Sequence, residues 1–334
     1  MRDYTAIKEC KYSGVLADIC KNFIIEKRAV GYLYKREAKQ LSEFSRFSEN
    51  FVIPANTLTE EVVKAWINKK TTDSDRNRYA RFSLIKQFSE YMQRMGYSTY
   101  CPKRDEIGKT YHNNYIPYIF THEEIKKFFE AADAMPVRSI SPRRHLVMPV
   151  MFRILYCCGL RVSEATELCD KDVDLDEGIL VIHNSKFGKT RYVPMSAELT
   201  GVCAKYAKTR LIAEQGDDWF FAAPDGGHYS VKEIYYVFRN LLWQAEISHG
   251  GRGKGPRVHD FRHTFCVHCL QKWVKKGADP STVLPRLSAY LGHDGFESTE
   301  RYLRMTAEVY PEISELMQEK YGYVIPKNEE DKPI

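Results

Sequence analysis

Four segments in the second half of the sequence carry residues suited to the cleavage of a phosphate ester. They supply arginines that could hold a phosphate, histidines that could move a proton, a lysine and a tyrosine. In chain order these residues are Arg161, Lys186 or Lys189, His259, Arg262, His293 and Tyr302. Together they offer a nucleophile, positive charge for the phosphate oxygens and a proton for the leaving group.

Each side chain fits one of these tasks. The guanidinium groups of Arg161 and Arg262 could hold a phosphate by forked hydrogen bonds, and they stay protonated at any working pH. This fixed charge would make a metal ion unnecessary, so we expect no metal and no other cofactor. The phenol of Tyr302 could attack phosphorus, with His259 and His293 available to handle protons. A lysine in the 184–189 turn could protonate the leaving hydroxyl as general acid.

The segments, taken in order, resemble the tyrosine recombinase family, also called phage integrases. The resemblance rests on GLRVSE at 159–164, HDFRHTF at 259–265, LGH at 291–293 and STERY at 298–302. It covers about 121–310 and implies site-specific DNA cleavage and rejoining through a 3′-phosphotyrosine on Tyr302, without metal or ATP. It also favours Lys186 over Lys189 as the general acid and makes Glu164 a supporting residue beside Arg161.

The resemblance further implies an architecture and partners. We expect a mainly α fold with a small β-hairpin or sheet, in which two domains form a C-shaped clamp on double-stranded DNA. Family members act as a dimer on each recombination site and as a tetrameric synapse. They often pass a C-terminal helix to a neighbour, and residues 306–322 could form such a helix in cis or in trans. The layout is similar to Xer-like or mobile-element recombinases.

Simpler interpretations exist for each motif. Arg161 and Glu164 could form only a surface ion pair, since residues at i and i+3 are neighbours on a helix. Tyr302 is one of 22 tyrosines. Cys266 and Cys269 form a Cys-x-x-Cys, but they lie within an apolar helical pattern that favours core thiols over zinc ligands. At the level of function, the rivals are a type IB topoisomerase and a non-catalytic DNA-binding regulator.

The elements that must position these residues can be read from local patterns. Thr121 and Glu124 form a capping box that begins a helix. Two β-branched runs, 178–183 and 190–194, predict a β-hairpin around the lysine-containing turn. The predicted domains are a helical core-binding (SAM-like) DNA-binding domain at 1–108, a linker at 109–120, a catalytic domain at 121–322 and a charged tail at 323–334.

The first domain reads as four helices. The first is predicted by apolar residues that recur at helical spacing: Leu16, Ile19, Cys20, Phe23 and Ile24. The others are expected at about 31–48, from Thr57 or Thr59 onward, and at about 75–95 with Gly96 as the C-cap. Thr57 and Glu60 make a capping-box pattern for the third helix. The fourth helix carries a basic set that could contact DNA phosphates or form a solvated face: Arg76, Arg78, Arg81 and Lys86.

Bulk composition agrees with a DNA partner. The 334 residues carry a formal net charge of +6. The segment from Thr306 onward contains seven acidic residues and three lysines, so the first 305 residues carry a formal net charge of +10. Nine scattered cysteines, no signal-peptide pattern and no apolar run of membrane-spanning length predict a reduced, cytoplasmic protein that does not enter a membrane.

Overall fold

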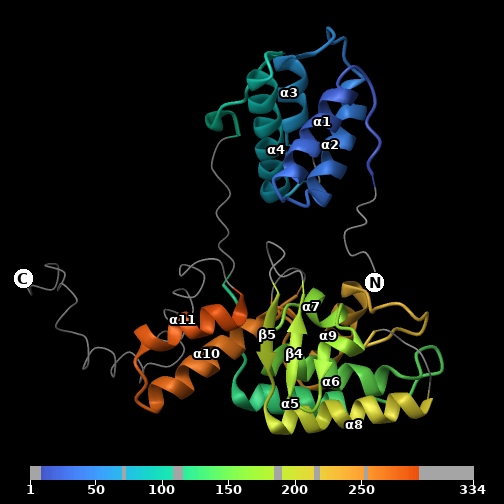
Figure 1. The fold of residues 1–334 in the computed structure, drawn as a ribbon, viewed down its shortest axis with the longest axis vertical. Coiled ribbons are helices and arrows are strands. Elements are labelled where there is room, and N and C mark those ends of the chain that lie inside the picture. Colours follow the sequence, from blue (N-terminus) through green and yellow to red (C-terminus); the bar gives the residue numbers. More distant parts are fainter. Residues whose placement is uncertain are drawn as a thin grey trace, which may run out of the picture. The chain divides into compact units, whose positions relative to one another are not determined.

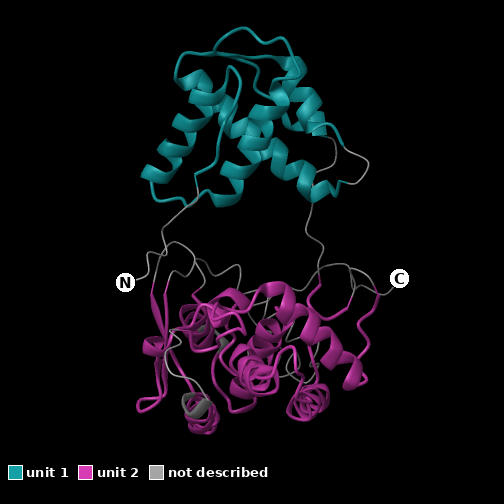
Figure 2. Cartoon of the chain, turned by 90° about the vertical axis from the view of Figure 1, so that its right-hand side faces the viewer, with its two compact units in different colours: residues 1–115 teal, residues 116–334 magenta. Residues whose placement is uncertain are grey.

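The computed structural model divides the chain into two compact units, residues 1–115 and 116–334 (Figure 2). It describes residues 9–69, 73–107, 116–183, 190–213, 219–251 and 255–292. The division falls inside the segment 109–120 that the sequence analysis assigned to a linker. Each unit has its own apolar core, so each is described separately.

The described part of unit 1 is a helical bundle (Figure 1) with a short parallel strand pair. Aromatic rings fill its core, where Phe88 meets Phe23 at 5.5 Å and Phe44 at 6.3 Å between centroids. Such edge-on contacts add to the stabilisation from burial. The elements are α1 (Ala17–Ala29), α2 (Lys35–Ser48), β1 (Thr57–Leu58), α3 (Glu60–Ile67), α4 (Asp75–Arg94), β2 (Ser98–Thr99) and the 3₁₀ helix η1 (Arg104–Ile107).

The four predicted helices of this unit are confirmed, but the start of α3 differs from the capping-box pattern. Thr59 is its N-cap, and Thr57 lies in strand β1, paired with Ser98. The capping box of Thr57 and Glu60 is therefore wrong, because pairing with a distant strand takes Thr57 out of the helix end. Gly96 follows the C-cap of α4 with a φ of +81°, a conformation that glycine adopts without a steric penalty.

The described part of unit 2 is mainly α-helical with one small sheet, which confirms the prediction of a mainly α fold with a small sheet (Figure 1). The capping box of Thr121 and Glu124 is also confirmed at the start of its first helix. The helices are α5 (His122–Asp133), α6 (Arg144–Cys157), α7 (Val162–Thr166), η2 (Asp170–Asp172), α8 (Ala197–Ala213), α9 (Val231–Gln244), α10 (Asp260–Lys275) and α11 (Pro280–Leu291). None of the helices in the described ranges is long and apolar enough to cross a bilayer.

The predicted hairpin forms strands β4 (Ile179–Ile182) and β5 (Arg191–Pro194) of an antiparallel sheet. Its register pairs Ile182 with Arg191 and Leu180 with Val193. Leu180 and Val193 are buried, so this face of the hairpin points into the unit. A third strand, β3 (Val173–Asp174), pairs with β4 and was not predicted. Two residues are too few to show a period in the sequence.

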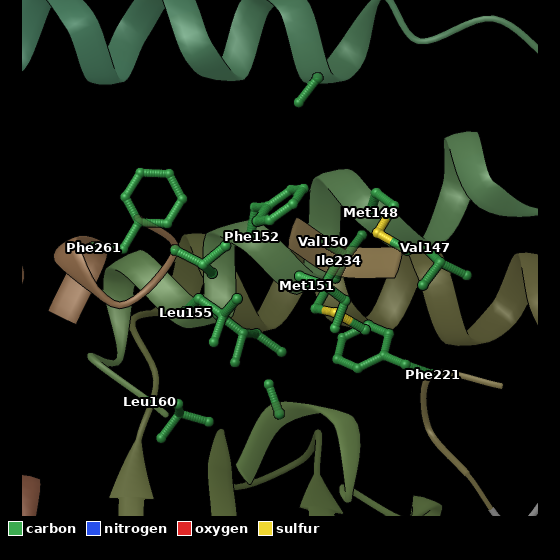
Figure 3. Close-up of a cluster of buried hydrophobic side chains, with 14 of the residues drawn as sticks. Val147, Met148, Val150, Met151, Phe152, Leu155, Leu160, Phe221, Ile234 and Phe261 are labelled. Atoms are coloured by element: carbon green, nitrogen blue, oxygen red, sulfur yellow. The ribbon is translucent and has the colours of Figure 1, made fainter. Parts of the chain in front are cut away.

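Helix α6 forms the centre of the unit 2 core (Figure 3). It is apolar on nearly all sides, as expected for a helix surrounded by other elements. Phe152 on α6 packs against Phe128 of α5, at 5.4 Å and 88°, and against Phe261 of α10, at 6.2 Å and 76°. Because Phe261 directly precedes Arg262, the core fixes the position of that arginine.

We expect Phe152→Ala to lower the free energy of unfolding by about 3–5 kcal/mol, because it removes a fully buried ring from a packed core. Urea denaturation followed by circular dichroism would measure this change. Ile140→Ala is the control, since Ile140 is 91% exposed in the same unit. Equal losses for the two variants would contradict the central role of α6.

Candidate active site

The candidate site is built around the carboxylate of Glu164 on the short helix α7. Glu164 Oε2 accepts the backbone N–H of Arg161, at 2.8 Å, and so caps the start of its own helix. Glu164 Oε1 accepts a second hydrogen bond from Arg161 Nη1 at 2.7 Å. The side chain of Glu164 is only 6% exposed, whereas that of Arg161 is 28% exposed. The ion pair is therefore partly buried, and its arginine remains open to solvent.

A second arginine, Arg191, reaches the same carboxylate from strand β5. Its Nη1 and Nη2 donate to Oε1 and Oε2 of Glu164, at 2.9 and 2.8 Å. Its Nε donates to the carbonyl of Tyr290 near the end of α11, at 3.1 Å. Arg191 was not among the site residues predicted from the sequence. The signal was present in the strand alternation, which places Arg191 on the same face as buried Val193 and so calls for a buried anion.

Arg262 lies on the other side of Glu164, on α10. Its Nη1 is 4.0 Å from Glu164 Oε2 and donates to the carbonyl of Gly159 at 2.7 Å. Its Nη2 donates to the carbonyl of Leu291 at 2.7 Å. The side chain is 2% exposed, so this structure holds Arg262 inside the protein, beneath the more open Arg161.

Gly159 allows this close packing. Its φ is +59°, and a Cβ there would lie 2.6 Å from the ring of Phe265. No larger residue fits this position, which lets the backbone carbonyl reach Arg262.

Arginines from segments about a hundred residues apart thus converge on one carboxylate. Burial alone would raise the pKa of Glu164, but hydrogen bonds and charge from Arg191 and Arg161 outweigh it and lower that pKa to about 2. Glu164 is therefore ionised throughout the neutral range. The cluster still carries more positive than negative charge, which suits it to an anionic ligand.

His259 stands beside this cluster, at the N-cap of α10. His259 is exposed to solvent. Its imidazole lies edge-on to the His263 ring, with 4.9 Å between the ring centroids. Partial loss of hydration, followed by the charges of Arg262 and Arg161, lowers the pKa of His259 to about 4. The ring is therefore neutral at pH 7 and able to accept a proton or a hydrogen bond.

The remaining predicted site residues lie outside the described residues. These are Lys186, the alternative Lys189, His293 and Tyr302. The described chain runs up to the segments that contain them. Strand β5 begins at Arg191, two residues after Lys189, and α11 ends at Leu291, two residues before His293.

The Cys-x-x-Cys segment lies on α10, and the described residues contain no group of three or more side chains that could hold a metal ion. Cys266 is fully buried in an apolar cluster with Leu270 of α10 and Leu287 of α11. Helices α10 and α11 lie side by side around this cluster (Figure 1). The thiol therefore packs as an apolar core group.

Two of the four basic residues predicted to contact DNA have structural roles in unit 1. Arg81 is 6% exposed and donates to the carbonyls of Trp66 and Asn68, at 3.0 and 2.9 Å, and to Asp73. Arg78 donates to the carbonyls of Ile67 and Ile107, and more weakly to Glu106.

These two arginines satisfy carbonyls at the end of α3, where the helix leaves acceptors unpaired and favours positive charge. The expectation that Arg81 offers its charge to a phosphate is corrected by this burial. Arg76 is exposed, and Lys86 is 43% exposed beside Glu90, at 3.8 Å. Their contact with DNA stays a prediction.

We expect Arg81→Ala to lower the free energy of unfolding by about 3 kcal/mol, because it removes the hydrogen bonds of a buried guanidinium to two backbone carbonyls and to Asp73. Lys86→Ala on the same helix is the matched control and should change it by less than about 0.5 kcal/mol. Thermal or urea unfolding would measure both. A neutral Arg81→Ala would show that its hydrogen bonds contribute nothing to unit 1.

We expect the His259 ring to titrate near pH 4 in the free protein, below the ordinary 6.5. Because the folded-state pKa is the lower one, protons bind the unfolded chain more readily, and this group reduces stability as the pH falls from 6.5 towards 4. Imidazole proton shifts measured by NMR would give the pKa, with His259→Gln assigning the signal. A midpoint near 6.5 would contradict the proposed influence of the arginines.

Comparison with known proteins identifies the family to which this geometry belongs. Residues 119–308 match the model of the phage integrase family. A putative integrase/recombinase of Sinorhizobium fredii is 28% identical over 314 residues, which cover 90% of this chain and 96% of that protein. The tyrosine recombinase XerC of Oceanobacillus iheyensis is 26% identical over 293 residues, covering 85% and 89%.

Solved structures share the fold. The XerH site-specific recombinase bound to its palindromic difH substrate aligns with a TM-score of 0.64 at 17% identity, over 96% of this chain and 92% of that one. The Tn1549 transposon integrase in complex with transposon right end DNA aligns with a TM-score of 0.58 at 17% identity, over 88% and 99%. The family match over more than half of its length shows that this chain belongs to the phage integrase family, as a tyrosine-type site-specific recombinase.

Proposed function

We propose that this recombinase cleaves and rejoins DNA through a 3′-phosphotyrosine on Tyr302, without a metal ion or a nucleotide. The observation that carries the proposal is the convergence of Arg161 and Arg262 on Glu164, although the two arginines lie far apart in the chain. A surface ion pair between Arg161 and Glu164 would not require Arg191 and Arg262 as further partners of the carboxylate. A cationic cluster that binds an anion would require several arginines held together.

Positive charge at this cluster would stabilise the phosphate during cleavage. Arg161, the more exposed arginine, would donate to the non-bridging oxygens as charge builds up on them. Arg262 would add its charge from below and hold the backbone around the site in place. Because both groups are fixed before DNA arrives, little reorganisation would be needed at the moment of reaction.

The proposed step exchanges one bond to phosphorus for another. The phenolic oxygen of Tyr302 forms a bond to phosphorus as the bond to the 5′ oxygen breaks. The phenol proton passes to an imidazole, for which His293 and the neutral ring of His259 are the candidates, and the 5′ oxygen takes a proton from Lys186. A bound phosphate would offset the charge of the arginines and so raise the pKa of His259. Rejoining reverses these steps, since the covalent bond conserves the energy of the phosphodiester.

Double-stranded DNA carrying a recombination site is the proposed partner. The XerH structure named above contains its difH substrate, and the Tn1549 structure contains transposon right end DNA. We infer a dimer on each site and a tetramer at synapsis, with Arg76 and Lys86 as candidate phosphate contacts of unit 1. Glu164 acts through the arginines rather than on DNA. We infer a cytoplasmic location, because recombination of cellular or mobile-element DNA takes place there and the nine cysteines fit a reducing compartment.

The test is covalent trapping on a DNA site selected from random duplexes by binding to the purified protein. A version nicked next to the cleavage position should trap a protein–DNA adduct with the wild type. We expect Tyr302→Phe to bind the same DNA with unchanged affinity and to form no adduct, because it lacks only the attacking oxygen. Tyr236→Phe is the matched control, since Tyr236 is an exposed tyrosine on α9.

Three outcomes would count against the proposal. An adduct with Tyr302→Phe would move the nucleophile to another residue. Binding by the wild type without any adduct would favour a DNA-binding regulator. Relaxation of supercoiled plasmid that lacks the selected site would favour a topoisomerase.

A further inference from the structure

Arg191 joins three parts of unit 2 that approach each other at the candidate site. It is the first residue of β5, and its side chain is 10% exposed. Its two terminal nitrogens form a forked pair with both oxygens of Glu164, at 2.9 and 2.8 Å. Its Nε donates to the carbonyl of Tyr290 on α11 at 3.1 Å. One side chain therefore connects the hairpin, the start of α7 and the end of α11.

The forked contact decides how Glu164 can move. A planar guanidinium that binds both carboxylate oxygens fixes the orientation of the carboxylate as well as its position. Arg161 contacts the same carboxylate through one terminal nitrogen and its backbone N–H. Arg191 thus sets the carboxylate plane, and the carboxylate in turn holds Arg161, which is the more exposed cation of the site.

Arg191 also contacts the end of α11, directly before the Leu-Gly-His segment at 291–293. Arg191 holds the carbonyl of Tyr290, and Arg262 holds the following carbonyl, that of Leu291. Gly292 has a φ of +67°, and a Cβ there would lie only 3.2 Å from Arg191 Cδ. Two cations at the carbonyl end of a helix are favourable on electrostatic grounds. They also fix the chain one residue before His293.

We propose that Arg191 is a positioning residue for DNA cleavage, which orients Arg161 through Glu164 and holds the end of α11 at the site. The inference rests on the proposed function of this site. Arg191 itself does not contact DNA in this scheme, because its side chain is buried and its three nitrogens are directed at Glu164 and Tyr290. Its loss should therefore slow the reaction more than it weakens DNA binding.

The first test uses Arg191→Lys, which keeps the charge and loses the planar fork. We expect single-turnover adduct formation on the nicked DNA to slow by roughly 10²-fold, the effect of a small misplacement of catalytic groups, with little change in the DNA dissociation constant. Arg210→Lys is the matched control. The side chain of Arg210 is 8% exposed, close to the 10% of Arg191, and its partners lie outside the site: Trp219, Phe220 and Asp170.

The second test separates positioning from a general loss of stability. In the wild type Glu164 stays ionised at every pH of the assay, because its pKa is about 2. The charged and titratable groups facing it are Arg161, Arg191, Arg262 and His259. In Arg191→Gln the strongest of these interactions is gone, so the pKa of Glu164 rises.

Protonation of Glu164 would then release Arg161, and the rate of adduct formation should fall as the pH is lowered from 7 towards 5. Adding Glu164→Gln to Arg191→Gln should remove this new pH dependence. A variant that is merely less stable would gain no such acid limb.

The outcomes distinguish this inference from the proposed function. Absence of an adduct with the wild type would overturn the proposed function itself. A normal wild-type adduct, with Arg191→Lys as fast as Arg210→Lys and no acid limb in Arg191→Gln, would overturn the role of Arg191 alone. Urea unfolding of each variant would show the conditions under which it stays folded, and the rates are compared under those conditions. Arg191→Lys remains informative if Arg191→Gln does not fold.

Discussion

A single buried carboxylate, that of Glu164, determines how the site of this recombinase is organised. Three guanidinium groups gathered without a negative charge between them would repel one another, and a buried carboxylate without partners would be costly. The carboxylate reduces the repulsion between the guanidinium groups, and the guanidinium groups offset the cost of burying the carboxylate. Arg161 and Arg191 contact Glu164 directly, and Arg262 lies 4.0 Å from it. The low pKa of Glu164 keeps this balance intact at neutral pH. The cluster is therefore assembled before DNA binds, with Arg161 on its open side.

The apolar core supplies the precision that the charged groups need. Phe261 packs among the rings of α5, α6 and α9, and its neighbour Arg262 is carried into place with it. Gly159 permits a backbone approach that any side chain would block. A tightly packed interior transmits small displacements, so residues far from the phosphate can still set the geometry around it. The chemistry and the packing of unit 2 are thus parts of one arrangement.

Unit 1 shows that positive charge in a sequence has more than one use. Arg78 and Arg81 lie on helix α4, whose sequence predicts a basic face. Both nevertheless donate hydrogen bonds to the carbonyls at the end of α3. Lys86 on the same helix stays at the surface beside Glu90. Only the exposed cations remain available to a phosphate backbone. Counting basic residues therefore overestimates the surface that a helix can offer to DNA.

The sequence by itself determined the features that depend on near neighbours. Helical periodicity, the capping box at Thr121, the hairpin and each of the four motifs depend on residues close together in the chain, and the mainly α fold and the family agree with them. Tertiary structure decided what depends on distant contacts. Thr57 joins a strand because Ser98 lies beside it, Arg81 is buried because the end of α3 needs donors, and Arg191 faces Glu164 because the hairpin folds against α7 and α11. A polar side chain takes its role from its partners, and those partners come together only when the chain has folded.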